Sequence, residues 1–381
     1  MNILIICDLF YPSKRSVSLL IQKLTLELIK RKNRVTLFTT SSLNNDKKEI
    51  FDKFRNLEIV RFSLFNLHSN NYIFRVVGQL SSLAFFAIIL ILKKKKIEKI
   101  FIYSPPLFYG LIFLFFKKQI KILNLQDFFP QNAVDLKIIK NSLIINFLKK
   151  IEKIIYFNSD FIFVHSNNAK NYLKKKFPII KNKIFLQYNW EQFNKIIYNK
   201  KKKNKKFIFI FGGSIGPSQN LEMLVKPFKE LRREAELHIY GEGIHLQYIK
   251  KKIKDLNIKN IRIFPYLSEN VFANRVRNAD SAIVTLSIKN KTPIIPGKFN
   301  FYCSNAKNIT SIVNKESDIH KISKKYKLGY SIDSEDPDRI KKLLSIVIKK
   351  NSKLHQADKN AYTFAKKNFN VKDLATKLEK I

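Results

Sequence analysis

The sequence predicts an α/β protein made of two Rossmann-like, doubly wound halves. The chain opens with a strand–helix–strand pattern over residues 1–39, and a second such series begins at Phe207, after a purely polar stretch. A strand that leads through a helix into a parallel strand implies a right-handed crossover, and repeats of this unit build a doubly wound sheet. At 381 residues the chain is long enough for two domains, each with its own core.

The first half alternates apolar runs with amphipathic segments. Met1–Cys7 and Val35–Thr39 are apolar runs typical of buried strands, and Leu19–Lys32 between them has the period of an amphipathic helix. These three segments form the first βαβ unit. Further strands are expected at Glu58–Phe62, Lys99–Tyr103, Ile120–Leu125, Phe161–His165 and Ile184–Gln187.

A lysine-rich stretch divides the chain. Residues 199–206, NKKKKNKK, carry no apolar side chain and predict a solvated linker. We therefore expect an N-terminal domain over residues 1–190, a linker over 191–206 and a second domain over 207–360. Its strands are expected at Phe207–Phe211, Glu236–Tyr240, Ile261–Phe264 and Ser281–Leu286, and its helices near Ile244–Leu256 and Asn270–Arg277.

Residues 207–221, FIFIFGGSIGPSQNL, are the most informative stretch. Five apolar residues are followed at once by Gly212, Gly213 and Gly216, and the pattern becomes helical from Gln219. Strand, glycine turn and helix together direct backbone N–H groups and a positive helix end at a phosphate. The stretch is neither a P-loop nor a G-x-G-x-x-G fingerprint, so a tight turn without a ligand is the alternative.

The charge of the chain is extreme. The formal net charge is +43, which suits nucleic acid, an anionic membrane or an anionic substrate. A genome that favours Lys, Asn and Ile codons is the competing explanation. Cys7 and Cys303 form neither a zinc-binding spacing nor a disulfide framework, and Met1-Asn2 leads straight into a strand without a basic leader. A reducing cytoplasm fits these features.

Two apolar segments of the first half have basic ends. Val76–Leu92 has 17 uncharged residues and is followed by Lys93–Lys96, and Leu107–Phe116 is followed by two lysines. The first is close to the lower limit for a membrane span. The alternatives are helices that lie on an anionic membrane surface and core helices of the α/β sandwich.

Short motifs follow one another in a specific order along the chain. They are ICDLFYPSKRSVSLLIQKLTLELIKRKNRVTLFTT at the start, YSPPLFYG at 103–110, LQDFFPQNAV at 125–134, LQYNW at 186–190, GGSIGPSQNLE at 212–222, YGEG at 240–243, NADSAIVTL at 278–286 and IIPGKFNFY at 294–302. In this order they resemble family 4 glycosyltransferases of the GT-B fold, and most of all the branch of L-fucosamine and colanic-acid transferases that builds bacterial surface polysaccharides. The match covers nearly the whole chain, and its order and spacing are more specific than any one piece.

The resemblance implies two Rossmann-like domains that face each other across a cleft and a nucleotide-sugar donor bound by the second. Lys298 is then the residue for the donor diphosphate, because one cation opposite two phosphates offsets the charge that grows on the leaving nucleotide. Gly213, Ser214 and Gly216 would hold the phosphates through backbone N–H groups, assisted by Gln219. Glu242 would approach the nucleotide; a surface-turn carboxylate is the other interpretation. No cofactor and no metal are expected.

The acceptor would bind the first domain. Asp127 follows a strand and precedes a rigid apolar turn, so it could accept a proton from an acceptor hydroxyl, bind the acceptor or cap the turn. Ser16 and Ser18 lie in the first loop, and Lys14 and Arg15 there could meet an acceptor pyrophosphate. His165 fits a hydrogen-bonded structural role better than a catalytic one. Asn189 and Trp190 would mark the hinge, and residues 361–381 would cross back onto the first domain.

The chain departs from the family at two positions. Two glutamates eight positions apart are replaced by Pro293 and Phe301, so the expected carboxylate contacts to the donor sugar and to the ribose are missing. The first loop also lacks the family's glycines, and Ala306 replaces another. The chain is therefore either an active divergent enzyme or a non-catalytic partner of another transferase.

The leading hypothesis is a retaining glycosyltransferase that extends a lipid-linked saccharide in surface polysaccharide, O-antigen or capsule synthesis. It would act on the cytoplasmic face of the plasma membrane, as a peripheral protein. A non-hydrolysing sugar-nucleotide epimerase shares the two-domain fold and is the alternative enzyme. A nucleic-acid binder is suggested by charge alone, since no recognition module is evident.

Overall fold

The computed structural model describes residues 1–13, 15–40, 51, 53–62, 72–93, 97–135, 138–193, 206–288 and 293–381. The chain forms two compact units. Met1–Gln192 and Val371–Ile381 make up the first unit, and Phe193–Asn370 makes up the second. Lys14, residues 94–96 and most of the expected linker lie outside the described residues.

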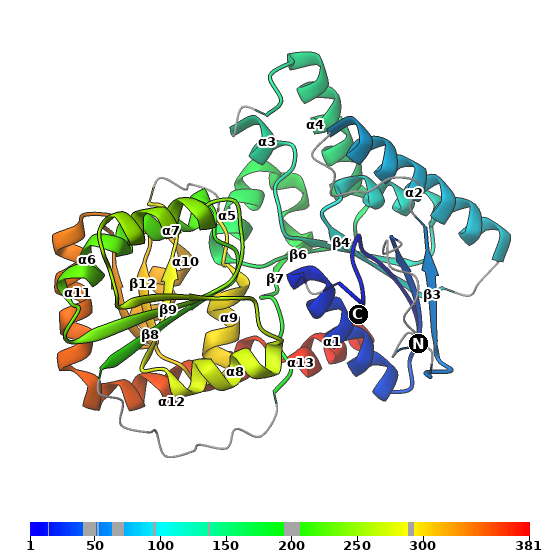
Figure 1. Ribbon diagram of the computed structural model, residues 1–381. Helices are drawn as coiled ribbons and strands as arrows, with labels where there is room; N and C mark the ends of the chain where they lie inside the picture. Colours follow the sequence, from blue (N-terminus) through cyan, green and yellow to red (C-terminus); the bar gives the residue numbers. More distant parts are fainter. Residues whose placement is uncertain are drawn as a thin grey trace. The chain divides into compact units, whose positions relative to one another are not determined.

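A parallel sheet of seven strands, in the order β3-β2-β1-β4-β5-β6-β7, forms the centre of the first unit (Figure 1). The order reverses between β1 and β4, and ligands of doubly wound sheets bind at such a reversal, beside the carboxyl ends of the strands. The strands agree with the expected apolar runs to within two residues at either end. They are β1 (Asn2–Ile6), β2 (Arg34–Thr39), β3 (Leu57–Arg61), β4 (Lys99–Ser104), β5 (Ile120–Leu125), β6 (Phe161–Val164) and β7 (Ile184–Leu186).

Helical layers cover both faces of this sheet. Leu4 and Ile6 of β1 belong to one core, whereas Ile3 and Ile5 belong to the other, as the alternation of a strand requires. The first core lies under α2 (Tyr72–Lys93), the 3₁₀ segment η1 (Leu107–Phe115) and α4 (Ser142–Asn158). The second lies under α1 (Ser16–Lys30) and α13 (Val371–Lys380). The remaining elements are α3 (Gln131–Asp135), α5 (Asn167–Lys176) and η2 (Pro178–Lys183).

The final helix, α13, is an integral part of the first unit. Arg31 donates hydrogen bonds to Thr376 Oγ1 at 2.8 Å and to Glu379 Oε2 at 2.9 Å. Lys99 Nζ donates to the Leu378 carbonyl at 2.6 Å. The segment that returns to the first unit thus begins at Val371, while α12 (Asn351–Asn368) belongs to the second unit.

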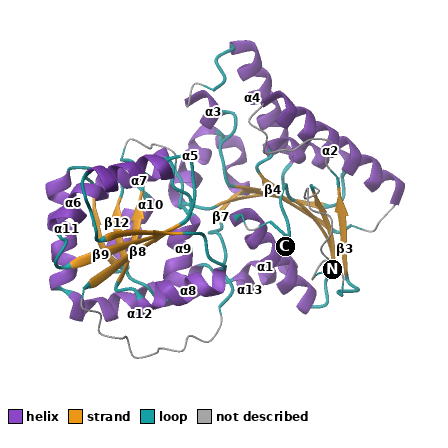
Figure 2. Cartoon of the chain, in the orientation of Figure 1, coloured by secondary structure: helices purple, strands orange, loops and turns teal. Residues whose placement is uncertain are grey.

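The second unit has a parallel sheet of six strands in the order β10-β9-β8-β11-β12-β13, with helices on both sides (Figure 2). Its reversal lies between β8 and β11. The strands are β8 (Phe207–Gly212), β9 (Ala235–Tyr240), β10 (Ile261–Phe264), β11 (Ser281–Thr285), β12 (Ile309–Ile312) and β13 (Gly329–Ile332). The helical elements are η3 (Pro217–Gln219), η4 (Leu221–Leu224), α6 (Val225–Glu230), α7 (Leu246–Asp255), α8 (Glu269–Asn278), α9 (Gly297–Ser304), α10 (Asp318–Lys325), α11 (Pro337–Lys349) and α12.

The helix expected from Gln219 is broken into short pieces. Asn220 separates η3 from η4 and adopts a left-handed conformation, with φ of 44°. Its side chain donates to Glu335 Oε1 at 3.0 Å. Asn tolerates this conformation better than most residues, so the backbone turns here rather than continuing as one helix.

The two apolar segments of the first unit have different positions. Leu107–Phe116 is not a surface helix, because Leu107–Gly110, Ile112 and Phe113 are buried in the core as a 3₁₀ segment. Val76–Leu92 lies within α2. Among the described residues, no helix combines the length and apolar character that a bilayer crossing needs.

Candidate functional site

The second unit gathers the expected donor residues at the reversal between β8 and β11. Gly212 ends β8, and Gly213 follows it. Lys298 lies in the first turn of α9, after the carboxyl end of β11. A side chain on Gly213 would have its Cβ 3.7 Å from Lys298 Cε and 3.9 Å from Lys298 Nζ. Two residues 85 positions apart therefore meet at the edge of the sheet where ligands bind.

The side chain of Lys298 ends in a buried amine. Its Nζ is inaccessible to solvent and has no hydrogen-bond acceptor in the described part of the chain. The ammonium lies 3.5 Å from the centroid of the Phe211 ring. Burial lowers the pKa of Lys298 to about 7. A phosphate group would supply both the missing acceptor and the missing counter-charge.

Glycines allow the loop after β8 to contact the turn after β9. Gly213 has φ of 110°, and a side chain on Gly241 would place its Cβ 1.9 Å from the Gly213 carbonyl oxygen. The Gly213 N–H donates to the Tyr240 carbonyl at 2.9 Å, and the Ile215 N–H donates to the Glu242 carbonyl at 2.8 Å. The turn after β9 thus fixes the loop after β8.

This pairing changes what the glycine loop can offer to a phosphate. The N–H groups of Gly213 and Gly216 already have acceptors, because the Gly216 N–H donates to Gln219 Oε1 at 3.1 Å. In this structure Gln219 holds the loop. Ser214 is exposed at its tip, and so is the Glu242 side chain in the neighbouring turn.

An aromatic wall stands beside Lys298, and sequence reasoning missed it. Phe301 stacks on Phe272, with ring centroids 5.5 Å apart and an interplanar angle of 14°. Phe272 contacts Tyr240 at 5.5 Å, and Tyr240 stacks on Phe264 at 4.7 Å. Tyr302 is fully buried, and its hydroxyl accepts the Gly212 N–H at 2.7 Å. Each ring is the last residue of a strand or lies on α8 or α9, so the wall depends on the sheet order.

The first unit has its own group of polar side chains at the carboxyl edge of its sheet. Asp127 follows β5 and is open to solvent, yet dense protein around it raises the pKa of its carboxyl. Asn189 Nδ2 donates to Gln126 Oε1 at 2.8 Å, and this bond fixes Gln126, the residue before Asp127. A solvent-accessible carboxyl whose proton is held more tightly than usual suits proton exchange with a hydroxyl.

Asp8 is a second carboxyl at this edge, and no sequence pattern singled it out. It follows β1, at the reversal between β1 and β4. Burial raises the pKa of Asp8 to about 7, although Arg15 acts in the opposite direction. The only available signal was its place after the first strand, which many loop residues share.

His165 and the hinge residues have structural roles. Burial lowers the pKa of His165 to about 4, and the ring hydrogen-bonds the backbone of Leu125. The histidine is therefore neutral at physiological pH, as its structural interpretation predicts. Trp190 is fully buried in the second core of the first unit and donates through Nε1 to the Leu20 carbonyl at 2.7 Å.

The expected acceptor residues of the first loop are divided between surface and interior. Arg15 and Ser16 are exposed at the start of α1. Ser18 is fully buried, and its hydroxyl accepts a hydrogen bond from Gln22 Nε2 at 2.8 Å. A ligand outside the first unit would thus meet Arg15 and Ser16 before Ser18. Lys14 lies outside the described residues.

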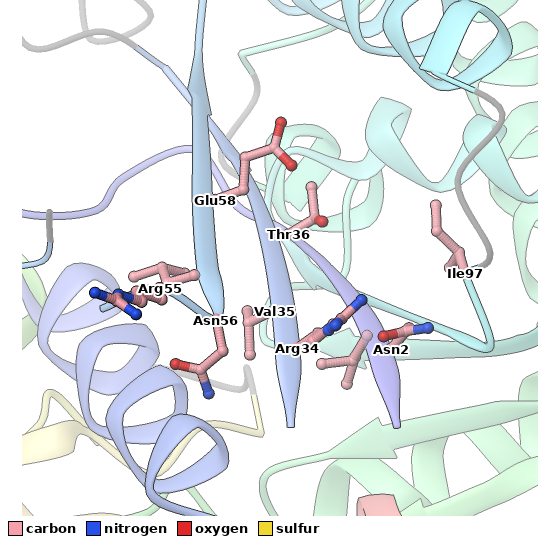
Figure 3. Close-up of a pocket in the computed structure, with 10 residues that line it drawn as sticks. Asn2, Arg34, Val35, Thr36, Arg55, Asn56, Glu58 and Ile97 are labelled. Atoms are coloured by element: carbon pink, nitrogen blue, oxygen red, sulfur yellow. The ribbon is translucent and has the colours of Figure 1, made fainter. Parts of the chain in front are cut away.

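A cavity of about 400 Å³ lies at the opposite edge of the first sheet. Arg34, Thr36, Arg55 and Glu58 line it, at the amino ends of β2 and β3 (Figure 3). The carboxyl-edge residues Asp8 and Asp127 do not line it. The candidate site lies at the carboxyl ends of the strands instead, where Lys298 Nζ has no acceptor among the described residues and burial raises the pKa values of Asp8 and Asp127. Within the described ranges, no three His, Cys, Asp or Glu side chains are grouped as a metal site.

The second unit resembles a known protein family. Residues 192–364 match the family model described as glycosyl transferases group 1. This range nearly coincides with the second unit and includes Gly213 and Lys298. The probable glycosyltransferase WbjE of Pseudomonas aeruginosa is 23% identical over 237 residues. That alignment spans 58% of this chain and 58% of the relative.

Solved structures match the chain over its whole length. Sucrose-phosphate synthase from Thermosynechococcus elongatus superposes with a TM-score of 0.74, at 12% identity, over 100% of this chain and 97% of the other. The chain has the GT-B fold. HepE of Anabaena, solved in complex with UDP-glucose, gives a TM-score of 0.70 at 11% identity and full coverage of both chains. WaaG, a glycosyltransferase involved in lipopolysaccharide biosynthesis, gives 0.68 at 10% identity, over 99% and 98%.

Proposed function

We propose that the protein is a glycosyltransferase that moves a sugar from a nucleotide-sugar donor to a saccharide acceptor. The observation that carries this proposal is the buried ammonium of Lys298, which has no acceptor among the described residues and lies beside Gly213 at the reversal of the second sheet. The match of residues 192–364 to group 1 glycosyl transferases supports it. So do structural neighbours that were solved with UDP and UDP-glucose.

In this proposal the second unit binds the donor and stabilises the leaving group. The bond between the sugar and the diphosphate breaks, and negative charge grows on the diphosphate. Lys298 is placed to neutralise that charge from a site with little water, where an ionic interaction is stronger than in bulk solvent. Ser214 and Glu242 lie on the exposed lips of the two loops and would meet the sugar nucleotide.

The acceptor hydroxyl would approach the carboxyl edge of the first sheet. Asp127 is the accessible carboxyl there and is proposed to hold the proton of that hydroxyl, while Arg15 and Ser16 bind acceptor groups. We further propose that transfer retains the anomeric configuration and needs no metal or cofactor. The acceptor would be a lipid-linked saccharide of a bacterial surface polysaccharide. WaaG, which has a similar fold, is a glycosyltransferase involved in lipopolysaccharide biosynthesis, and this supports the choice.

Exposed apolar side chains on the first unit support a peripheral position on the cytoplasmic face of the plasma membrane. Leu143, Ile144 and Phe147 of α4 are 50–77% exposed, beside the exposed Lys149 and Lys150. On α2, Ile88 and Ile91 are also exposed. Apolar groups next to lysines are the pattern of a surface that rests on anionic lipid.

Donor binding by single-lysine variants tests the proposed site. Lys298→Ala should weaken the binding of the preferred nucleotide sugar about ten- to a hundredfold, since a charge-assisted hydrogen bond is lost. Lys229→Ala is the matched control, because it removes one exposed charge of the same unit on α6. The donor is first identified by mass spectrometry of ligand retained from a panel of UDP-, GDP- and dTDP-sugars. Equal losses in the two variants would assign binding to the overall positive field.

The same panel separates the alternatives. Release of epimerised sugar nucleotide without an acceptor would support an epimerase. Donor binding without transfer to any lipid-linked saccharide would support a non-catalytic partner protein, consistent with Pro293 and Phe301 in place of two carboxylates. Formation of a glycosylated lipid supports the transferase.

A further inference from the structure

One face of the first sheet changes from apolar to polar towards its amino edge. On β2, Phe38 belongs to the core under α2, and Thr36 and Arg34 precede it on the same face. On β3, Glu58 pairs in register with Thr36, and Val60 pairs with Phe38. The other face of these strands stays apolar over the same length, with Val35, Leu37, Leu57 and Ile59 in or against the second core. Since a parallel sheet is apolar where helices cover it, the polar positions mark where the cover of the first core ends.

The cavity of about 400 Å³ lies over these polar positions (Figure 3). Asn2 of β1 joins them, because it pairs in register with Arg34. Ile97 belongs to the first core and adds an apolar side to the cavity. The cavity is therefore built on strands of the sheet, and its volume is within the range of about 300–1,000 Å³ that is typical of small-molecule sites.

The charged side chains of the cavity are two arginines and one glutamate, Arg34, Arg55 and Glu58. Neither guanidinium has a hydrogen-bond acceptor or an ion-pair partner within the ranges that the structure describes. In Figure 3, Arg34 extends towards Asn2, whereas Arg55 points away from the other labelled side chains. Arg34 is thus the cation that a ligand in the cavity would meet first.

The spacing of Arg34 and Glu58 limits the kind of ligand. They occupy neighbouring strands at positions two residues apart in register, so their Cα atoms are about 8 Å apart, a separation that one sugar ring can bridge. A guanidinium binds a phosphate through two parallel hydrogen bonds. A carboxylate has about four lone-pair sites and can accept from ligand hydroxyls in addition to a protein donor. A polyphosphate would bring further negative charge against Glu58, and a neutral sugar would leave Arg34 without an anion.

We propose that this cavity binds a phosphorylated monosaccharide. The phosphate binds Arg34, and hydroxyls of the sugar donate to Glu58, with Thr36 and Asn2 as further polar contacts. This site is at the amino ends of the strands, whereas Asp8 and Asp127 follow the carboxyl ends of theirs. It is therefore separate from the proposed acceptor site of the same unit and does not depend on the proposed transferase activity.

Calorimetry on the full-length chain tests the ligand class with three probes: glucose 6-phosphate, inorganic phosphate and glucose. Glucose 6-phosphate should bind with a Kd at least about tenfold lower than either of the others, because only it engages both Arg34 and Glu58. Equal affinities for glucose 6-phosphate and inorganic phosphate would reduce the cavity to a non-specific anion site and overturn the proposal. The absence of saturable binding of glucose 6-phosphate would also overturn it.

Single variants locate the binding. Arg34→Gln should weaken the binding of glucose 6-phosphate about ten- to a hundredfold. Arg232→Gln is the matched control, because it removes one exposed guanidinium of the second unit. Equal losses in the two variants would assign binding to the overall positive field and overturn the proposal. Thermal unfolding confirms that each variant is folded.

Glu58→Gln tests the contact with the sugar. It replaces a charged acceptor by a neutral one of similar shape, so the preference for glucose 6-phosphate over inorganic phosphate should narrow about three- to tenfold. An unchanged preference in the folded variant would show that Glu58 does not bind the hydroxyls and would overturn this part of the assignment.

The donor-site variant separates this proposal from the proposed function. Lys298→Ala should leave the binding of glucose 6-phosphate unchanged. If Lys298→Ala abolishes that binding and Arg34→Gln does not, the sugar phosphate occupies the donor site and the cavity proposal is wrong. If glucose 6-phosphate binds through Arg34 while no nucleotide sugar binds at all, the cavity site stands and the proposed function falls.

Discussion

Lys298 has a protonation equilibrium that should be visible in donor binding. Its pKa is lowered to about 7 by burial, so a substantial fraction of the free protein carries a neutral amine above that pH. A bound diphosphate favours the charged form and raises the pKa. Binding above pH 7 therefore takes up a proton, and affinity falls as pH rises.

We predict that the affinity for UDP-glucose, used as a probe, is nearly constant below pH 7 and falls by up to about tenfold per unit above it. The pyrophosphate of a sugar nucleotide does not titrate in this range. Calorimetry between pH 6 and 9 measures the slope. In Lys298→Ala the slope should vanish, and a slope that persists there would assign the titration to another group.

Asp8 makes the stability of the protein depend on pH. Its pKa is raised from the ordinary value of 3.8 to about 7 by burial, so the folded chain binds a proton that the unfolded chain has released. The contribution of this proton to the free energy of unfolding is fully present below pH 4 and is lost as pH rises through 7. We expect Asp8→Asn to stabilise the protein at pH 8 relative to the parent by about 1–4 kcal/mol, with little difference at pH 4.

Urea unfolding at the two pH values measures this difference. Asp255→Asn is the control, because Asp255 is an exposed residue at the end of α7. A gain of the same size at pH 4 and pH 8 would mean that packing, not the proton, explains the Asp8 variant.

At the scale of elements, the strongly apolar runs were predictable, whereas two short strands with polar residues or glycine were not. The runs at β1, β5 and β8 are apolar enough to be recognised alone. In contrast, β12 and β13 have four residues each, with sequences ITSI and GYSI, and the prediction missed both. Their burial comes from neighbouring strands and helices, which a local pattern does not contain.

The candidate site was likewise predictable only in part. Gly213 and Lys298 could be placed together, because both follow strand ends at a reversal of sheet order. The wall of Tyr240, Phe272 and Phe301 could not, because it depends on how β9, α8 and α9 pack against one another. The occupied N–H groups of Gly213 and Gly216 also depend on a non-local loop contact and a local side-chain conformation.

The contact between the two loops of the second unit gives a prediction for Gly241. Its φ is 154°, and an added Cβ would collide with the Gly213 carbonyl. Gly241→Ala should cost roughly 2–4 kcal/mol of folding stability and should abolish donor binding through displacement of the loop. Gly216→Ala is the control, since its Cβ would meet just the flexible Gln219 side chain, at 3.3 Å. The loss of folding stability in Gly216→Ala should stay within about 1 kcal/mol. If Gly241→Ala binds donor normally, the loops move independently.

At the scale of the whole molecule, positive charge is spread over both units, whereas exposed apolar groups are not. The net charge of +43 is a property of both units and cannot by itself locate a partner. Exposed large apolar side chains, in contrast, are concentrated on α2, the end of η1 and α4 of the first unit. Both α2 and α4 contact η1, so these residues belong to one layer over one face of the sheet. The amphipathic period of α4 predicts a face, but not whether another element covers it.

Membrane association can be tested on α4, whose outward face is the most exposed. Phe147 is 62% exposed, and Leu143 lies one turn before it with 77% exposure. If this face enters the headgroup region, Phe147→Ser should weaken sedimentation with anionic phospholipid vesicles by roughly tenfold, because the transfer of one aromatic side chain is lost. Ile244→Ser is the matched control: Ile244 is 83% exposed but belongs to the second unit.

Replacing Lys149, Lys150 and Lys153 with Gln should remove about 1 kcal/mol of membrane-binding free energy for each lysine and make binding less sensitive to salt. All variants should keep their affinity for the donor. Equal losses for Phe147→Ser and Ile244→Ser would reduce the interaction to non-specific adsorption, and no sedimentation of the parent would remove the membrane from the proposal.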